Sequence, residues 1–330
     1  MDDAADVWAA ADLVTAMAVR VAATLGLADR VGRDGGTATE IARQVDADAD
    51  ALDRLLRHLV TVGLFAYEPD GRYVLTARGA SLRDGHPSGL RDRLDLEGAL
   101  GRSEASLVHL LHSVRTGEAC FPLEFGHGFW DDVASDPRRR AWFDAQMASD
   151  VATWAPAVLA SYPWGSFDHV VDVGGGDGTL LIALLRAHPR LRGTVIEQPA
   201  TADTARRSFT AAGLASRADA VAASFFEPMP AGADAYLLCA ILHDWDDDSA
   251  RTILRRCAQA AGSAGRVFVI EKPVREGAGD RTAMDLRLLA FFGGRERTVE
   301  QLRALAGEAG LRVVAVHGDG DVAVVEMSTT

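Results

Sequence analysis

The chain has 330 residues, enough for two domains, and its hydrophobic content of 48% predicts a soluble globular protein with a sizeable core. Acidic side chains outnumber basic ones, and the net charge of −13 argues against binding to nucleic acid or to an anionic membrane surface. The N-terminus carries aspartates instead of the basic region of a secretory signal, and no other run is apolar for the length of a membrane span. We therefore expect a cytoplasmic protein.

The first part of the chain is predicted to be helical. Apolar residues recur at threes and fours over residues 6–31, which predicts one amphipathic helix. Thr37, followed three positions later by Glu40, is a capping box that begins a second helix, and a third helix follows at about 48–62. Two short strands around the turn at 69–71 complete a winged helix-turn-helix.

Two functions compete for this winged-helix module. DNA binding would use Arg54, Arg57 and His58 on the recognition helix. Four aspartates at the start of that helix would repel phosphates, so we favour a dimerisation scaffold: Asp46, Asp48, Asp50 and Asp53. Residues 6–90 also hold more apolar side chains than a domain of this size can bury alone, which predicts a homodimer.

Residues 96–155 are predicted to be irregular helices with a loop at 117–128. A helix starts at Phe129, and its aromatic side chains, with Met147 further on, are candidates for the roof of a pocket. The alternative for each of these residues is an ordinary place in a helix core. The predicted domain plan is a winged-helix dimerisation domain over 1–95, a helical linker and pocket roof over 96–155, and a cofactor-binding domain over 156–330.

The most informative stretch runs from Phe167 to Leu181. A β-branched run ends at Gly174, and leucines then recur at helical spacing, so the glycines lie at a helix N-terminus, where free N–H groups bind polar ligands. The alternative is that the glycines only let strand and helix pack closely. Gly174, Gly176 and Gly178 form Gly-x-Gly-x-Gly, which is closer to an S-adenosylmethionine (SAM) motif than to a dinucleotide fingerprint.

The rest of the chain predicts an α/β fold. Strands and helices alternate from 167 to 327, as in a doubly wound sheet, and the last two strands form an antiparallel hairpin typical of class I methyltransferases. Glu197 ends the second strand, where an acidic side chain accepts hydrogen bonds from a ribose diol. The predicted fold class is therefore a Rossmann-like class I methyltransferase sheet preceded by an α-helical winged-helix dimerisation domain.

A second informative stretch, 235–248, carries a candidate base. A strand leads into a turn with His243, and Asp247 or Asp248 is predicted to cap the next helix, from Ala250 to Ala260. Ligands of an open parallel sheet lie beyond the carboxyl ends of its strands, so His243 should face the same crevice as the glycines. A histidine there can take a proton from a hydroxyl near neutral pH, although such a residue is often only structural.

At this point the sequence resembles a known family. The segments 172–178, 242–247, 269–271 and 293–298 look like the motifs of SAM-dependent small-molecule O-methyltransferases. These include the plant caffeate type and bacterial enzymes of aromatic polyketide antibiotic biosynthesis, such as anthracycline and naphthoate methyltransferases. The resemblance covers nearly the whole chain, because those proteins begin with a winged-helix dimerisation domain.

The resemblance implies a role for each matching residue. His243 is the expected general base, flanked by the carboxylates of Glu271 and Glu296. Ser224 stands where an aspartate is common, and Cys239 where many members have a lysine near the cofactor. The residues expected at the cofactor are Asp172, Gly174, Gly176, Glu197, Ser224, Phe225, Phe226 and Cys239. Those expected at the acceptor are Met147, Leu288, Phe291 and Phe292.

The implied reaction is direct transfer of the SAM methyl group to a hydroxyl of an aromatic small molecule, leaving S-adenosylhomocysteine. No metal is expected, and the three cysteines are read as free thiols. The alternative is a hydroxylase or decarboxylase of the same fold that retains SAM as a structural ligand. If the two chains interlock, as in the family, Met17 or Arg20 of one chain would complete the pocket of the other.

Overall fold

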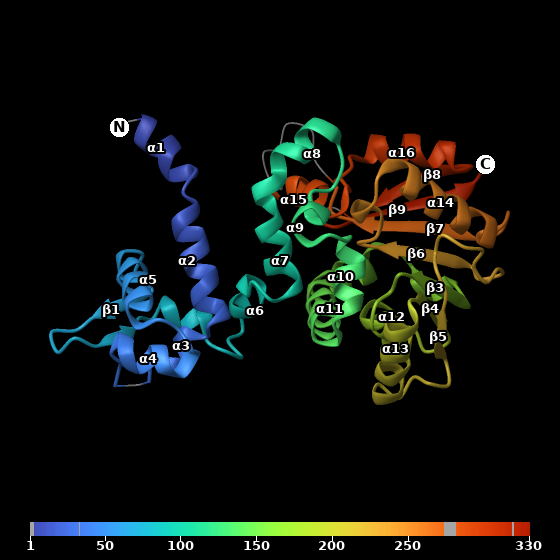
Figure 1. The fold of residues 1–330 in the computed structure, drawn as a ribbon. Coiled ribbons are helices and arrows are strands. Elements are labelled where there is room, and N and C mark those ends of the chain that lie inside the picture. The colour runs from blue at the N-terminus through green and yellow to red at the C-terminus, as the bar shows by residue number, and fades with distance from the viewer. Residues whose placement is uncertain (1–2, 33, 274–281, 319) are drawn as a thin grey trace. The chain divides into compact units, whose positions relative to one another are not determined.

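The computed structural model describes residues 3–32, 34–273, 282–318 and 320–330 (Figure 1). It divides the chain into two compact units, 1–105 and 106–330. The helices after residue 105 therefore belong with the sheet, in part because α11 (Pro137–Ser161) packs against α12 (Thr179–Ala187). These limits differ from the predicted segment boundaries at residues 95 and 155.

The first unit is a helical domain with a small antiparallel hairpin. The predicted capping box is present: Thr37 Oγ1 accepts from Glu40 N at 3.3 Å, and Glu40 Oε2 accepts from Thr37 N at 2.8 Å. Its elements are α1 (Asp3–Ala10), α2 (Leu13–Thr24), α3 (Leu27–Arg30), α4 (Ala38–Val45), α5 (Ala49–Thr61), β1 (Phe65–Tyr67), β2 (Tyr73–Leu75), η1 (Gly79–Leu82), α6 (Leu90–Leu94) and α7 (Ala99–Ser106), the last reaching one residue past the unit's limit.

The prediction of one helix over 6–31 is wrong. The Asp12 carboxylate accepts from the N–H groups of Val14 at 3.0 Å and Thr15 at 3.2 Å, so it caps α2 just after α1 has ended. Gly26, with φ of 62°, separates α2 from α3.

Among the described residues, 6–24 is long and apolar enough to cross a membrane by length and composition alone, contrary to expectation. Ala18 and Ala22 of that stretch are nevertheless buried in the core of the first unit.

The second unit is built on a seven-stranded sheet with the order β5-β4-β3-β6-β7-β9-β8. The first five strands of the unit are parallel, and β8 and β9 form the predicted antiparallel hairpin. The strands are β3 (His169–Val173), β4 (Arg192–Glu197), β5 (Ala218–Ala222), β6 (Ala235–Cys239), β7 (Arg266–Glu271), β8 (Leu311–His317) and β9 (Ala323–Thr329).

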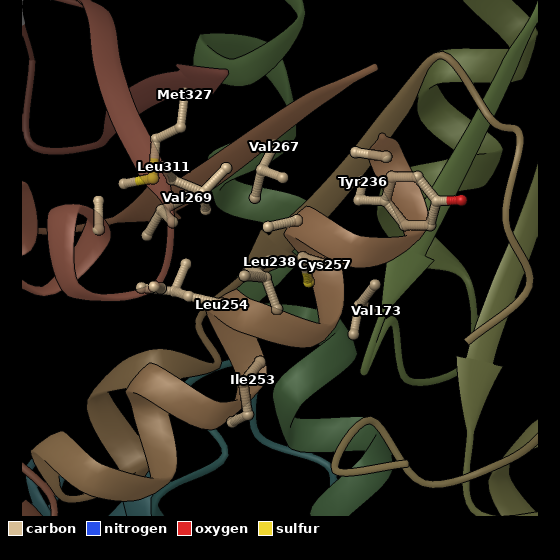
Figure 2. Close-up of a cluster of buried hydrophobic side chains, with 14 of the residues drawn as sticks. Val173, Tyr236, Leu238, Ile253, Leu254, Cys257, Val267, Val269, Leu311 and Met327 are labelled. Carbon is tan, nitrogen blue, oxygen red and sulfur yellow. The ribbon is translucent and has the colours of Figure 1, made fainter. Parts of the chain in front are cut away.

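Helices cover both faces of this sheet (Figure 1). The α14 helix (Asp247–Ala261) and α16 (Val299–Glu308) lie on one face, and Figure 2 shows the buried cluster there, with Val173 and Leu238 of the sheet close to Ile253 and Leu254. On the other face, α11, α12 and α13 (Pro199–Ala211) pack against the alternate side chains of the same strands. The sheet is therefore buried on both sides, which explains its continuous apolar strands.

Shorter helices complete the second unit. The α9 helix lies inside the segment predicted to be a loop, whereas α10 begins at Phe129 as predicted. The elements are η2 (Leu107–His109), α8 (Leu110–Thr116), α9 (Phe121–Phe125), α10 (Phe129–Ser135), η3 (Trp164–Ser166), η4 (Leu242–Asp244) and α15 (Thr282–Phe292). The strand order reverses between β3 and β6, and open α/β sheets bind ligands at the carboxyl ends of such a strand pair.

Candidate active site

The glycine turn after β3 is tight at one end and open at the other. Gly174 has φ of 71°, and a Cβ there would lie 2.5 Å from Ile241 Cδ1, so a side chain is disfavoured on both counts. Gly176 has φ of 58°, but a Cβ there would meet nothing within 4 Å. The backbone at Gly176 therefore borders free space in front of the helix N-terminus, as a ligand-binding turn requires.

Asp172 is a buried carboxylate beneath this turn. Its exposed fraction is 1%, and neither carboxylate oxygen has a hydrogen-bond partner among the described residues. Burial raises the pKa of Asp172 to about 7, and the carboxylates of Glu197 and Asp177 add to the effect. A buried anion without a partner is costly, so this position suits a cationic ligand. SAM carries both an ammonium and a sulfonium charge, and the site fits it.

Glu197 ends β4 in the predicted place. Its Oε2 accepts from Gln198 N at 2.6 Å, and burial raises the pKa of its carboxyl. Two charged residues of α11 lie beside it, which no local motif in the sequence indicated. Arg140 Nη2 donates to Gln198 Oε1 at 3.0 Å, and Asp144 Oδ2 accepts from Thr201 Oγ1 at 3.3 Å. These residues act on Glu197 only because α11 packs against α12 within the second unit.

Three aromatic rings form a wall next to the glycine turn. Phe225 Cε1 would lie 3.5 Å from a Cβ at Gly174, which places this ring at the turn. Both Phe225 and Phe226 meet the ring of Trp245 edge-on, with centroids 5.8 and 4.8 Å apart. Ser224 is exposed, and its Oγ accepts from Phe226 N at 3.2 Å. The predicted adenine-contact residues thus lie together after the end of β5.

Cys239 is the last residue of β6 and is 8% exposed. Burial raises the pKa of its thiol well above the usual value, and the carboxylates of Asp172 and Glu271 add to the effect. A neutral thiol therefore lies near two buried acids at the floor of the crevice. It supplies none of the positive charge that a lysine would bring.

His243 lies on the turn that follows β6. Ala240, at the start of this turn, has φ of 55°, a strained conformation for a residue with a side chain. The backbone N–H of His243 donates to Glu271 Oε1 at 3.1 Å, and the imidazole Nε2 of His243 lies 3.5 Å from Asp244 Oδ1.

The cap of the helix after this turn differs from the prediction: Asp246, not Asp247 or Asp248, accepts from Ser249 N at 2.7 Å.

Buried acids surround this turn. Glu271 and Glu296 are 3% and 4% exposed. Burial raises the pKa of Glu271 to about 7, although the Arg297 guanidinium acts in the opposite direction. Burial also raises the pKa of Asp244 well above its usual value, and both glutamates add to the effect. Sequence reasoning identified the two glutamates but neither Asp244 nor Arg297.

The predicted acceptor residues are only partly brought together. Phe292 lies with its ring stacked on Trp130, at a centroid distance of 5.6 Å, and Trp130 also stacks on Trp245 at 6.2 Å. Phe292 and Met147 are half-buried. Leu288 and Phe291 are buried, 3% and 5% exposed, and Phe291 packs with Cys120 and Ala290 in a small cluster that Phe292 also contacts. Across the described parts of the chain, no group of three or more His, Cys, Asp or Glu side chains is arranged to hold a metal ion.

A mostly parallel sheet with a terminal antiparallel hairpin, a Gly-x-Gly-x-Gly turn and an acid at the end of the second strand define a class I SAM-dependent methyltransferase. The chain matches the sequence model of an O-methyltransferase domain over residues 107–312 and of an O-methyltransferase dimerisation domain over residues 9–83. It belongs to the SAM-dependent O-methyltransferase family.

Known relatives match along most of their length. The 2,7-dihydroxy-5-methyl-1-naphthoate 7-O-methyltransferase of Streptomyces carzinostaticus is 51% identical over 97% of this chain and 96% of its own. A crystal structure of an O-methyltransferase from neocarzinostatin biosynthesis, with SAM and 2-hydroxy-5-methyl naphthoic acid, has a TM-score of 0.91 at 51% identity over 98% of both chains. Aclacinomycin 10-hydroxylase of Streptomyces purpurascens is 41% identical over 94% of this chain and 84% of its own.

Proposed function

We propose that this enzyme methylates a hydroxyl of a polyketide-type aromatic acid of about the size of a hydroxynaphthoate. The observation that carries this proposal is the position of His243 at the carboxyl edge of the sheet, among buried acids and next to stacked aromatic rings. The 51% identity to a naphthoate O-methyltransferase supports the acceptor class. The acidic net charge of −13 supports small-molecule partners over nucleic acid or anionic membranes.

Four groups of residues would hold the cofactor. The backbone of Gly174 and Gly176 lines the turn that leads into α12, Asp172 supplies a negative charge for the methionine end, and Glu197 would accept from the ribose hydroxyls. The rings of Phe225 and Phe226 would contact the adenine. When bound, SAM supplies a methyl group that its sulfonium centre already activates.

The chain's own contribution to the reaction is alignment and proton removal. His243 would take the proton from the acceptor hydroxyl, and the surrounding carboxylates would stabilise the resulting imidazolium. Asp244 Oδ1 lies 3.5 Å from His243 Nε2 and is one such carboxylate oxygen. Such a base contributes about 10²–10⁴-fold, and the remaining acceleration comes mainly from holding the acceptor in line and excluding water.

The stacked rings of Trp130, Phe292 and Trp245 fit the role of acceptor platform. Trp130 lies nearly parallel to Phe292 and to Trp245, with interplanar angles of 17° and 15°. Flat rings in this arrangement favour a planar aromatic acceptor. The buried Trp130 Nε1 has no hydrogen-bond partner among the described residues, so it could donate to a carboxylate or carbonyl of that acceptor.

We also propose that the enzyme works as a homodimer through its dimerisation domain. Four large apolar side chains of the first two helices are between 56% and 81% exposed, which is unusual unless a second chain covers them: Val7, Trp8, Leu13 and Val14. Arg20, proposed to reach the partner's pocket with Met17, is paired with Glu104 of its own chain at 2.8 Å. A cross-chain role for Arg20 therefore requires that this ion pair opens or is shared.

Similarity to a 10-hydroxylase makes hydroxylation with retained SAM the second candidate. The two reactions differ in what they consume. We would incubate the enzyme with SAM and a panel of hydroxynaphthoates and phenols, and follow S-adenosylhomocysteine and product mass together. Methyl transfer predicts one S-adenosylhomocysteine for each methylated product, whereas an oxygenated product without S-adenosylhomocysteine would support the hydroxylase.

A further inference from the structure

Arg297 is an exception to the usual exposure of arginine. Its exposed fraction is 1%, and it is the one buried Lys or Arg among the residues that the structure describes. It stands directly before Thr298, which caps α16 through a second capping box with Gln301. The backbone that carries Arg297 is therefore held by a helix start, and its side chain is presented from a rigid position.

All three guanidinium nitrogens of Arg297 bond to one short segment. Nη1 donates to Leu242 O at 2.7 Å, and Nη2 donates to Trp245 O at 2.8 Å. Nε and Nη2 both donate to Asp247 Oδ1, at 3.0 and 2.8 Å. The acceptors lie on both sides of His243 and at the first turn of α14. The planar guanidinium group of Arg297 thus joins the two ends of the turn that carries the candidate base.

The residues just before Arg297 contact the same turn through their main chain. The Arg295 N–H donates to His243 O at 2.9 Å, and a Cβ at Gly294 would lie 2.2 Å from that oxygen. Only glycine permits this close approach. The segment 293–297 is therefore fitted to the His243 turn by its main chain as well as by the Arg297 side chain.

Arg297 also balances charge. Glu271 faces two further acids, Glu296 and Asp244, and the thiol of Cys239. Arg297 acts on Glu271 in the opposite direction to these groups and favours its ionised form. Ionised Glu271 is a stronger acceptor for the backbone N–H of His243 than protonated Glu271. The charge of Arg297 therefore strengthens a hydrogen bond that holds the His243 turn.

We propose that Arg297 is a positioning residue for methyl transfer: its guanidinium fixes the turn that carries His243 and is the counter-charge for the buried acids around it. This inference rests on the proposed role of His243 as base. A displacement of a catalytic group by about 1 Å costs on the order of 10²-fold in rate, which sets the expected size of the effect.

The test compares three full-length variants. Arg297→Met removes the charge and the bonds, and Arg297→Lys keeps the charge but not the three-nitrogen fork. Arg295→Met is the matched control, because Arg295 is two residues away, has a side chain that is 48% exposed, and pairs with the same Asp247 carboxylate at 3.4 Å. For each variant we would measure kcat, KM for the acceptor, S-adenosylhomocysteine affinity, the pH profile of kcat and hydrogen exchange of the peptide spanning 242–247.

We expect Arg297→Met to lower kcat by about 10²-fold while the S-adenosylhomocysteine affinity stays within about twofold. The acid limb of its pH profile should move to higher pH, because Glu271 loses the charge that lowers its pKa. Arg297→Lys should lower kcat less and keep the wild-type acid limb. Exchange over 242–247 should be faster in both Arg297 variants than in Arg295→Met.

Two results would overturn the inference. One is an Arg297 variant whose kcat and exchange match those of Arg295→Met. The other is a loss of kcat that comes with weaker cofactor binding and an unmoved acid limb in the folded variants, which would mean a structural role only. If Arg297→Met does not fold, the inference is tested with Arg297→Lys alone, by comparing its kcat and its hydrogen exchange with those of Arg295→Met. Absence of methyl transfer in the wild-type enzyme would contradict the proposed function instead, and the exchange comparison would still test whether Arg297 fixes the turn that carries His243.

Discussion

Replacing Asp172 by asparagine should stabilise the ligand-free protein while weakening its cofactor binding. Asp172 is 1% exposed, and no described residue bonds to its carboxylate oxygens. Its surroundings therefore disfavour the charge in the absence of a cation. The asparagine side chain has nearly the same shape without the charge, so the substitution separates the electrostatic role of this position from its packing.

The size of the effect follows from the shift in its pKa. Burial raises the pKa of Asp172 from 3.8 to about 7. The pKa of Asp172 is higher in the folded chain than in the unfolded chain, so protonation of this carboxyl stabilises the fold. That stabilisation is full below pH 3.8 and is lost as the pH rises towards 7. At about 1.4 kcal/mol for each pKa unit, the ionised carboxylate costs the ligand-free fold on the order of 4 kcal/mol at pH 8. A change of that size corresponds to roughly 10 °C in melting temperature.

The assay is thermal unfolding of wild type and Asp172→Asn at pH 5 and pH 8, with and without SAM, together with calorimetric SAM binding. We expect the variant to melt higher at pH 8 without ligand, to depend less on pH, and to bind SAM about tenfold to a hundredfold more weakly. Asp203→Asn is the control, because it removes the same charge from a side chain that is 63% exposed. Equal melting temperatures at pH 8 and equal SAM affinities for Asp172→Asn and wild type would refute the reasoning.

Three further predictions concern the other parts of the machinery. His243→Ala should lower turnover by about 10²-fold or more with SAM affinity nearly unchanged, and unaltered turnover in steady-state assays would remove it from the base role. Glu197→Ala should instead weaken calorimetric SAM binding by about 1–3 kcal/mol, and identical affinities would mean that the ribose is held elsewhere. Deleting residues 1–30 should give monomers or aggregates without turnover, because it removes the exposed apolar residues Val7, Trp8, Leu13 and Val14. Sedimentation of an active, monodisperse monomer would contradict the dimer.

Features set by local chemistry were predictable from the sequence. The capping box at Thr37, the glycine turn after β3 and the acid at the end of β4 are short-range patterns with one physical solution each, and the structure has all three. The terminal hairpin was equally visible, because two apolar runs flank a turn. His243 was found because it follows a buried strand closely.

One local feature was missed. The apolar period continues through Asp12, so the sequence favoured one helix, and the capping bonds of that carboxylate show the break. Features set by tertiary packing were not predictable. Arg140 and Asp144 lie within a long helix with no motif, and they come near Glu197 only because α11 packs against α12. The burial of Arg297 depends on how the segment before α16 meets the His243 turn, which is a long-range contact.

The most direct test of the central claim is to follow a deuterated methyl group. The enzyme would be incubated with S-adenosylmethionine labelled with deuterium on its methyl, and with a hydroxynaphthoate as acceptor. Mass spectrometry of wild type and His243→Ala products should show a trideuteromethyl ether that forms with wild type and is lost or strongly reduced in the variant. A wild-type product that carries no deuterium, or equal labelling by the two proteins, would contradict methyl transfer with His243 as the base.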